Sequence, residues 1–199
     1  MNVTLDRRNN YDTDLTIGAV NIEPSKSVKF LGVIIDSNLD FSDNVERTIS
    51  KCNSRLYIMR RLKVLGMNTH GLKIFYCTCV RPVLTYAAPA WFYFLSDNLK
   101  NEMERVQKSA TRIILPDRCY SERVLLLGLP LVSDFILQSS TTIFSKIAAD
   151  PSHPLFSRVM PNVNRTSSRA PLLYRPARTR TTKRSKSFFN FFMNLSNNS

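Results

Sequence analysis

Apolar residues recur every three or four positions in the segment that follows Ser42. The series comprises Val45, Ile49, Cys52, Leu56, Met59, Leu62 and Leu65. This spacing places all of them on one face of an α-helix, and such a face must be buried against other elements. Ser42 is the predicted N-cap of this helix, and Gly66 its predicted C-terminal stop. The pattern therefore predicts a mainly α-helical fold with a packed helical body.

The same periodicity predicts further helices downstream. Thr69 is expected to cap the second helix, which Pro82 should kink or end because proline lacks the backbone N–H. Ser96 is expected to cap a third helix, whose apolar stripe ends at Ile113. Two more helices are expected, at residues 121–127 and at residues 131–149.

The N-terminal region predicts a small β-hairpin. Residues 15–22 and 28–35 are two apolar runs, the second rich in β-branched and aromatic residues, and a turn-rich Glu23-Pro24-Ser25-Lys26 connection separates them. The two runs are expected to pair with each other as antiparallel strands. Gly32 interrupts the second run, which is typical of a bulge or of a close backbone approach.

Charge is distributed unevenly along the 199 residues. There are 28 Lys and Arg residues against 15 Asp and Glu residues, which gives a net charge of +13. Residues 1–150 hold 19 basic and 15 acidic side chains, whereas the last 49 residues hold nine basic and no acidic ones. Together with five prolines, this composition predicts an extended basic tail. Such a charge favours polyanionic partners, either nucleic acid or an anionic membrane face, although a merely solubilising tail is the alternative.

The sequence offers little for catalysis. Only His70 and His153 could act as a histidine base, and no Gly-x-Ser-x-Gly, P-loop or dinucleotide-binding motif is present. Cys77 and Cys79 are too closely spaced for the usual zinc pair and have no second pair. We therefore expect no enzymatic activity of the chain as it stands, no small-molecule substrate, no metal site and no cofactor.

Location is predicted from apolar stretches and cysteine usage. The longest apolar stretch, residues 82–95, is shorter than the roughly 20 residues that a membrane helix needs, so no membrane span is expected. The start of the chain is polar and lacks the apolar core of a signal peptide. The four cysteines show no disulfide framework. An intracellular protein of the nucleus or cytoplasm is expected.

Four segments in a fixed order carry a family resemblance. They are Lys29-Phe30-Leu31-Gly32-Val33 with Ile35-Asp36, then Arg81-Pro82-Val83-Leu84-Thr85-Tyr86-Ala87 with Ala90-Trp91, then Glu104-Arg105-Val106-Gln107-Lys108-Ser109-Ala110-Thr111-Arg112-Ile113-Ile114, and finally Leu126, Gly128, Leu129, Pro130 and Leu131. In order and spacing they resemble the C-terminal part of the reverse transcriptases of non-LTR retrotransposons (LINE, jockey-like elements). The resemblance covers about four fifths of the chain and reaches the Arg-rich tail.

The resemblance implies an RNA-directed DNA polymerase as the parent protein. Phe30, Leu31 and Gly32 would match its primer-grip turn. Residues 1–40 would be a remnant of the palm, residues 41–150 the helical thumb and connection region, and residues 151–199 the basic tail with its aromatic end. The implied partner is nucleic acid, either RNA or an RNA–DNA template–primer duplex.

The family's metal-binding carboxylate box would lie upstream of Leu15, where this sequence has no such box. The resemblance therefore implies a truncated enzyme that cannot polymerise alone, and magnesium is expected only for the intact parent. A further possibility is that the chain is not stable by itself, because Val28, Phe30 and Val33 would lie at the edge of a missing palm.

Basic side chains of two helices and of the tail are the candidate nucleic-acid contacts. They are Arg47, Lys51 and Arg55 in the first helix, Arg105, Lys108 and Arg112 in the third, and Arg178, Arg180, Lys183 and Arg184 in the tail. The two helical rows are expected to be exposed and close to each other. In the alternative hypothesis these faces are only solvated, and the aromatic patch at residues 188–192 makes the chain a helical interaction module for a protein or a membrane surface.

Overall fold

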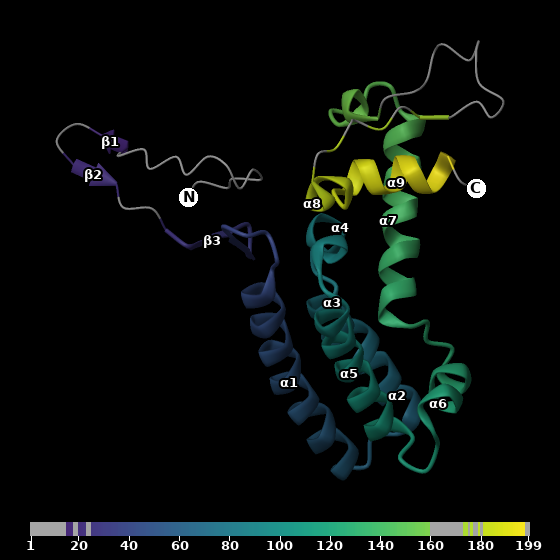
Figure 1. Cartoon of the computed structure of the whole chain (residues 1–199). Coiled ribbons are helices and arrows are strands. Elements are labelled where there is room, and N and C mark those ends of the chain that lie inside the picture. Colours follow the sequence, from purple (N-terminus) through teal and green to yellow (C-terminus); the bar gives the residue numbers. More distant parts are fainter. Residues whose placement is uncertain are drawn as a thin grey trace. The chain divides into compact units, whose positions relative to one another are not determined.

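The computed structural model describes residues 15–17, 20–22, 25–159, 173–174, 176, 179 and 181–197 (Figure 1). The protein is mostly helical, with a two-stranded antiparallel hairpin near the N-terminus, as predicted. It divides into two compact units. We call Lys29–Ile35 together with Asp40–Leu137 the helical body, and the other described residues the flanking unit.

The strands form two separate two-stranded sheets. Strand β1 (Leu15–Ile17) pairs antiparallel with β2 (Val20–Ile22), and β3 (Ser27–Phe30) pairs with β4 (Val33–Asp36). The predicted pairing of residues 15–22 with residues 28–35 is therefore wrong. Each run turns back on itself and forms its own hairpin.

The connection between β3 and β4 explains why the second run folds back. Leu31 and Gly32 both have positive φ angles, 45° and 88°. Two successive residues with positive φ make the two-residue turn whose twist suits an antiparallel hairpin, and glycine adopts this conformation without steric cost. Gly32 thus marks a turn and not a bulge within one strand.

Helix α1 (Ser42–Val64) buries most of the predicted apolar face, with Val45, Cys52 and Met59 fully inaccessible to solvent, but Leu65 at the end of that series is 79% exposed. Its beginning differs from the prediction. Phe41 precedes the helix in a left-handed conformation, and Ser42 donates from both its backbone N–H and its hydroxyl to the Asp40 carboxylate, at 2.9 and 2.8 Å. Ser42 is thus not the N-cap, because it is already the first residue of the helix and Phe41 occupies the cap position without a side-chain capping hydrogen bond.

The end of α1 follows the prediction. Gly66 has a φ of 88°, and its N–H donates to the Lys63 carbonyl at 3.0 Å. A glycine in this conformation satisfies carbonyls that the last helical turn leaves unpaired.

The second predicted helix is built from three pieces. Helix α2 (Thr69–Phe75) continues through the π-helical turn η1 (Tyr76–Val80) into α3 (Arg81–Leu84). The N-cap is Asn68 and not the predicted Thr69, because the Asn68 side chain accepts the Gly71 N–H at 2.8 Å. The chain stays helical through Pro82 to Leu84, so the proline does not end the helix, and the π turn lies just before it.

The rest of the body follows α3 in short and long helical pieces. In order these are α4 (Ala88–Trp91), the 3-10 turn η2 (Phe92–Phe94), α5 (Asp97–Ile114), α6 (Tyr120–Leu127) and the first part of α7 (Val132–Ala149). Ser96 caps α5 as predicted, and α5 packs along α1 (Figure 1). The buried stripe of α5 ends at Ile114, not at Ile113.

The flanking unit contains the end of α7, the 3-10 turn η3 (Phe156–Arg158), α8 (Thr182–Ser185) and α9 (Phe188–Asn197). Phe192 of α9 is 1% exposed and stacks on Phe144, with ring centroids 5.7 Å apart. The Phe188 ring lies 4.9 Å from that of Phe192. The predicted extended tail is therefore wrong for residues 182–197, because aromatic residues four positions apart form a helical face that packs.

Candidate nucleic-acid interface

A buried polar network holds the helices of the body in place. Its centre is Gln107, which is 1% exposed. Its carbonyl oxygen accepts the Tyr76 hydroxyl at 2.6 Å, while its amide nitrogen donates to the Pro130 carbonyl at 2.9 Å and to the Tyr120 hydroxyl at 3.1 Å. One side chain of α5 thereby joins η1, α6 and the connection that leads to α7.

Glu104 extends this network by one helical turn. Its carboxylate accepts the Val132 N–H, at the first residue of α7, at 2.9 Å, and also accepts the Tyr120 hydroxyl. Burial, followed by the hydrogen bond to Glu104, raises the pKa of Tyr120, and burial also raises the pKa of Tyr76. Both phenols remain neutral donors over the ordinary pH range. Two polar members of the Glu104–Ile114 segment thus stabilise the fold.

A groove on one flank of α1 brings together several residues that the sequence analysis singled out. It has a volume of about 650 Å³, and we call it the turn groove. It is lined by Gly32, Asn44, Thr48, Lys51, Ser54, Arg55, Pro82, Val83 and Tyr86. These residues come from the β3–β4 turn, from α1 and from the segment around α3, all within the helical body.

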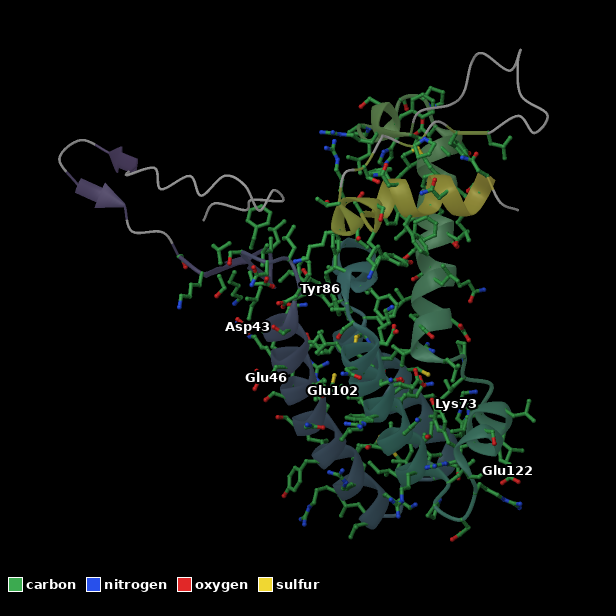
Figure 2. The ribbon with its side chains drawn as sticks, in the orientation of Figure 1. Asp43, Glu46, Lys73, Tyr86, Glu102 and Glu122 are labelled. Carbon is green, nitrogen blue, oxygen red and sulfur yellow. The ribbon has the colours of Figure 1, made fainter. Side chains whose placement is uncertain are left out.

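Tyr86 and Asn44 hold the β3–β4 turn against the helices. The Tyr86 hydroxyl donates to the Leu31 carbonyl at 3.1 Å, and a Cβ atom at Gly32 would lie 3.3 Å from Cε1 of the same ring. On the other side, the Ile34 N–H donates to the side chain of Asn44, which is 5% exposed, at 3.1 Å. Figure 2 shows Tyr86 near the N-terminal end of α1. Glycine is required here both for its φ angle and for the contact with the ring.

The position of Tyr86 is itself fixed by its neighbours in sequence. The buried Trp91 donates from its indole nitrogen to the Tyr86 carbonyl at 3.0 Å, across the left-handed residue Ala87. At the other end of the segment, the Arg81 guanidinium lies 4.3 Å from the centre of the Phe135 ring, as a cation–π contact requires. The Arg81–Ala87 segment is therefore a rigid wall of the groove.

The charges that line the turn groove come from α1. Lys51 is exposed, whereas the half-buried Arg55 donates to the Cys79 carbonyl and so has one of its donors engaged in the fold. Thr48 and Ser54 add hydroxyl groups, and no carboxylate is among the lining residues in the described part of the chain. Beneath them, burial raises the pKa of the Cys52 thiol to about 11, despite the opposing charges of Arg55 and Lys51.

The remaining predicted contacts on the helices do not gather in the turn groove. Arg47, Arg105, Lys108 and Arg112 are all exposed. Lys108 lies 5.2 Å from the centre of the Tyr120 ring, and Arg112 lines a different groove. The two predicted rows are thus exposed as expected except for the half-buried Arg55, but they do not share one site: Lys51 and Arg55 line one groove and Arg112 another.

Phe30 and Leu31, the two other residues expected to match a primer-grip turn, are 62% and 78% exposed. In the tail, Lys183 donates to the Asn38 carbonyl, and Arg184 is exposed on α8. Arg178 and Arg180 lie outside the described residues.

Several residues important for the groove were not predicted from the sequence. Tyr86 belongs to the segments that carry the resemblance and Asn44 was not singled out, and spacing alone does not reveal that the two residues hold the turn. The glycine at position 32 was the one available signal, since a close approach was one of its two expected roles.

Comparisons of the chain with protein-family models, with curated proteins and with solved structures find no match. Among the described residues, no group of three or more His, Cys, Asp or Glu side chains could hold a metal ion.

One described stretch, Tyr120–Ala149, is long and apolar enough to cross a membrane. It consists of two helices, α6 and α7, separated by the left-handed Gly128. Core helices of folded proteins pass the same test, so this is weak evidence, consistent with the expected lack of a membrane span.

Proposed function

We propose that this chain is the duplex-contacting part of a reverse transcriptase of the non-LTR retrotransposon type, and that its helical body binds template–primer through the turn groove. The observation that supports this most directly is the composition of the groove. Gly32 and the Arg81–Ala87 segment, which carry the resemblance, lie around one cavity with Lys51 and Arg55. Residues that are far apart in sequence thus share one basic surface.

The chemistry of the groove suits the backbone of a nucleic acid. Lys51 offers a free ammonium group and Thr48 a hydroxyl to phosphate or sugar oxygens, whereas the Ser54 hydroxyl donates to the Ser50 carbonyl at 3.3 Å. Tyr86 is 57% exposed and presents part of its ring for stacking. None of these contacts reads a base edge, so we propose binding without sequence preference, to RNA or to an RNA–DNA hybrid.

We further propose that the chain does not polymerise on its own. Metal-assisted phosphoryl transfer needs carboxylates placed to bridge two ions, and no segment of this sequence resembles the family's carboxylate box. Primer extension by the purified chain that is abolished by a chelator would contradict this proposal.

The alternative function, an interaction module for a protein or a membrane surface, depended on a free aromatic patch at residues 188–192. Phe192 is buried, and its ring contacts those of Phe144, Phe188 and Phe191. The rings are therefore largely occupied by one another, which favours the duplex-binding proposal.

The test is a titration of a fluorescent RNA–DNA hybrid with the full chain at several salt concentrations. Lys51→Gln should weaken binding and lower the slope of log affinity against log salt by about one, the loss of one phosphate contact. Lys51→Arg should keep most of the affinity, because it keeps the charge.

The matched control is Arg61→Gln, which removes the same charge from an exposed position of α1 that lines neither groove. We expect a clearly smaller loss. Equal losses for Lys51→Gln and Arg61→Gln would show that the groove has no special role, and binding that does not depend on salt would contradict phosphate contacts altogether.

A further inference from the structure

A second groove lies at the C-terminal ends of α1 and α5. It has a volume of about 560 Å³, and we call it the helix-end groove. It is lined by Arg60, Lys63, Val64, Ser109, Arg112 and Ile113, all within the helical body. It shares no lining residue with the turn groove, and only Arg112 of its six residues was expected to bind anything.

The lining of the helix-end groove carries three positive charges and no carboxylate. Arg60 and Arg112 are exposed, and neither forms an ion pair with any described residue. Lys63 donates to the Ile113 carbonyl and so ties the two helix ends together. The two helix C-termini contribute roughly half a negative charge each, which leaves a clear positive excess.

Such a site matches a phosphodiester backbone. Two unpaired guanidinium groups can each form paired hydrogen bonds with phosphate oxygens, and the Ser109 hydroxyl adds a further donor. Val64, which is 82% exposed, and Ile113 offer apolar surface that suits a sugar ring. A small free anion would fill only part of the groove and would not contact Val64 and Ile113.

The position of the helix-end groove relative to the turn groove follows from the geometry of α1. Lys51 and Lys63 are twelve residues apart on this helix, which corresponds to a rise of about 18 Å and a rotation of about 120°. Successive nucleotides of one strand advance about 3.4 Å along a duplex, so a rise of about 18 Å spans about five base pairs. The rotation puts the two grooves on different flanks of α1, so a duplex that lies over α1 can meet them only with its two different strands.

We infer that the helix-end groove is a second backbone-binding site, which contacts the same nucleic acid as the turn groove about five base pairs further along. This inference rests on the proposed function. It means that α1 carries two binding sites for one ligand. Affinity should then rise in one step when the ligand becomes long enough to span both grooves. A hybrid too short to span both grooves uses one of them, and a longer hybrid gains the second contact without a second loss of translational freedom.

The test compares the binding of the full chain to RNA–DNA hybrids of about 4 and about 14 base pairs, each closed by a loop that joins its two strands so that the short hybrid stays paired. For the unchanged protein the longer hybrid should bind much more tightly. Arg60→Gln combined with Arg112→Gln should weaken binding of the longer hybrid roughly tenfold and lower its salt slope by about two. The same double substitution should remove most of the difference in affinity between the longer and the shorter hybrid.

The matched control combines Arg61→Gln with Arg105→Gln. It removes the same two charges from exposed positions of the same two helices, and neither residue lines the turn groove or the helix-end groove. The pair Arg60→Lys with Arg112→Lys keeps the charge and should keep most of the affinity. Thermal unfolding followed by circular dichroism verifies that all variants fold.

The inference is overturned if the two double-Gln variants weaken the longer hybrid equally, or if the Arg60 and Arg112 pair has no effect while Lys51→Gln still does. In both cases the proposed function survives. If the unchanged protein binds neither hybrid but binds vesicles that contain phosphatidylserine, the proposed function fails together with the inference.

Discussion

The helical body and the flanking unit are stabilised by different kinds of contact. In the body, Gln107 and Glu104 connect four elements through directed hydrogen bonds, each with a defined partner. In the flanking unit, the rings of Phe144, Phe188 and Phe192 pack against one another with no hydrogen bond between them. Directed bonds fix one arrangement, whereas ring packing tolerates changes of shape. The body is therefore the better platform for a site whose side chains must be held in position.

The largest expected effect is that of Gln107→Leu. The substitution keeps a buried side chain of similar size, but it leaves the Tyr76 hydroxyl and the Pro130 carbonyl without their partner. Buried polar groups that lose their hydrogen bonds cost about 1–3 kcal/mol each, so we expect the free energy of unfolding in urea to fall by about 3 kcal/mol.

Asn101→Leu is the matched control for that experiment, because it places the same side chain at an exposed position of the same helix. Its effect should stay within about 0.5 kcal/mol. If Gln107→Leu lowered the free energy of unfolding as little as Asn101→Leu, the polar network would not stabilise the body, and the proposed difference between the body and the flanking unit would be wrong.

An intermediate effect is expected from alkaline pH, and it should arise in the body. The pKa of Cys52 rises from 9.0 to about 11 on folding because the thiol is buried. Between these values the unfolded chain loses a proton that the folded chain keeps, so the free energy of unfolding falls as the pH rises, by about 2 kcal/mol at pH 10.5. Below pH 9 this contribution is fully present.

The measurement is the free energy of unfolding in urea from pH 8 to pH 10.5. Cys52→Ala removes the titrating thiol, so its curve should be flatter above pH 9 whatever its stability at pH 8. The buried phenols of Tyr76 and Tyr120, whose pKa values are also raised, should steepen the fall near the upper end of this range. Parallel curves for both proteins would exclude Cys52 as the source.

The smallest effect should be that of Phe192→Leu in the flanking unit. Leucine fills most of the space of the ring, and the neighbouring rings can shift toward it, so we expect a loss of about 1 kcal/mol. Trp91 is the single tryptophan and lies in the body, so its fluorescence reports the unfolding of the body while circular dichroism reports both units. A loss of unfolding free energy as large as that of Gln107→Leu would show that the ring cluster tolerates a changed side chain as poorly as the polar network does.

The sequence predicts the helices well where a single local signal decides. Ser96 caps α5, and Gly66 and Gly128 end α1 and α6 with positive φ angles, because these conformations depend on a few neighbouring residues. The buried face of α1 was also predicted, since periodicity alone places Val45, Cys52 and Met59 together.

The errors occur where tertiary contacts compete with local signals. A run of β-branched residues predicts one strand, but Leu31 and Gly32 form a turn that the Tyr86 hydroxyl and ring hold in place. The sequence alone presents Arg55 as a candidate nucleic-acid contact with a free guanidinium. In the structure this guanidinium donates to a carbonyl of the neighbouring π turn. Neither partner can be found by spacing, because each lies more than twenty residues away.

The π turn at Tyr76–Val80 has a consequence for the length of the chain. A π turn holds one residue more than the α-helical turn it replaces, so it acts as a one-residue insertion absorbed within a continuous helix. Four α-helical residues cover nearly the same rotation as the five residues of the π turn, so removing the exposed Thr78 would let the segment close as ordinary α-helix with Pro82 and Val83 still at the wall of the turn groove. Removing a residue from the α-helical part of the segment would instead turn every later residue by about 100°. The segment can thus lose one residue at the π turn and still present the same wall to the groove.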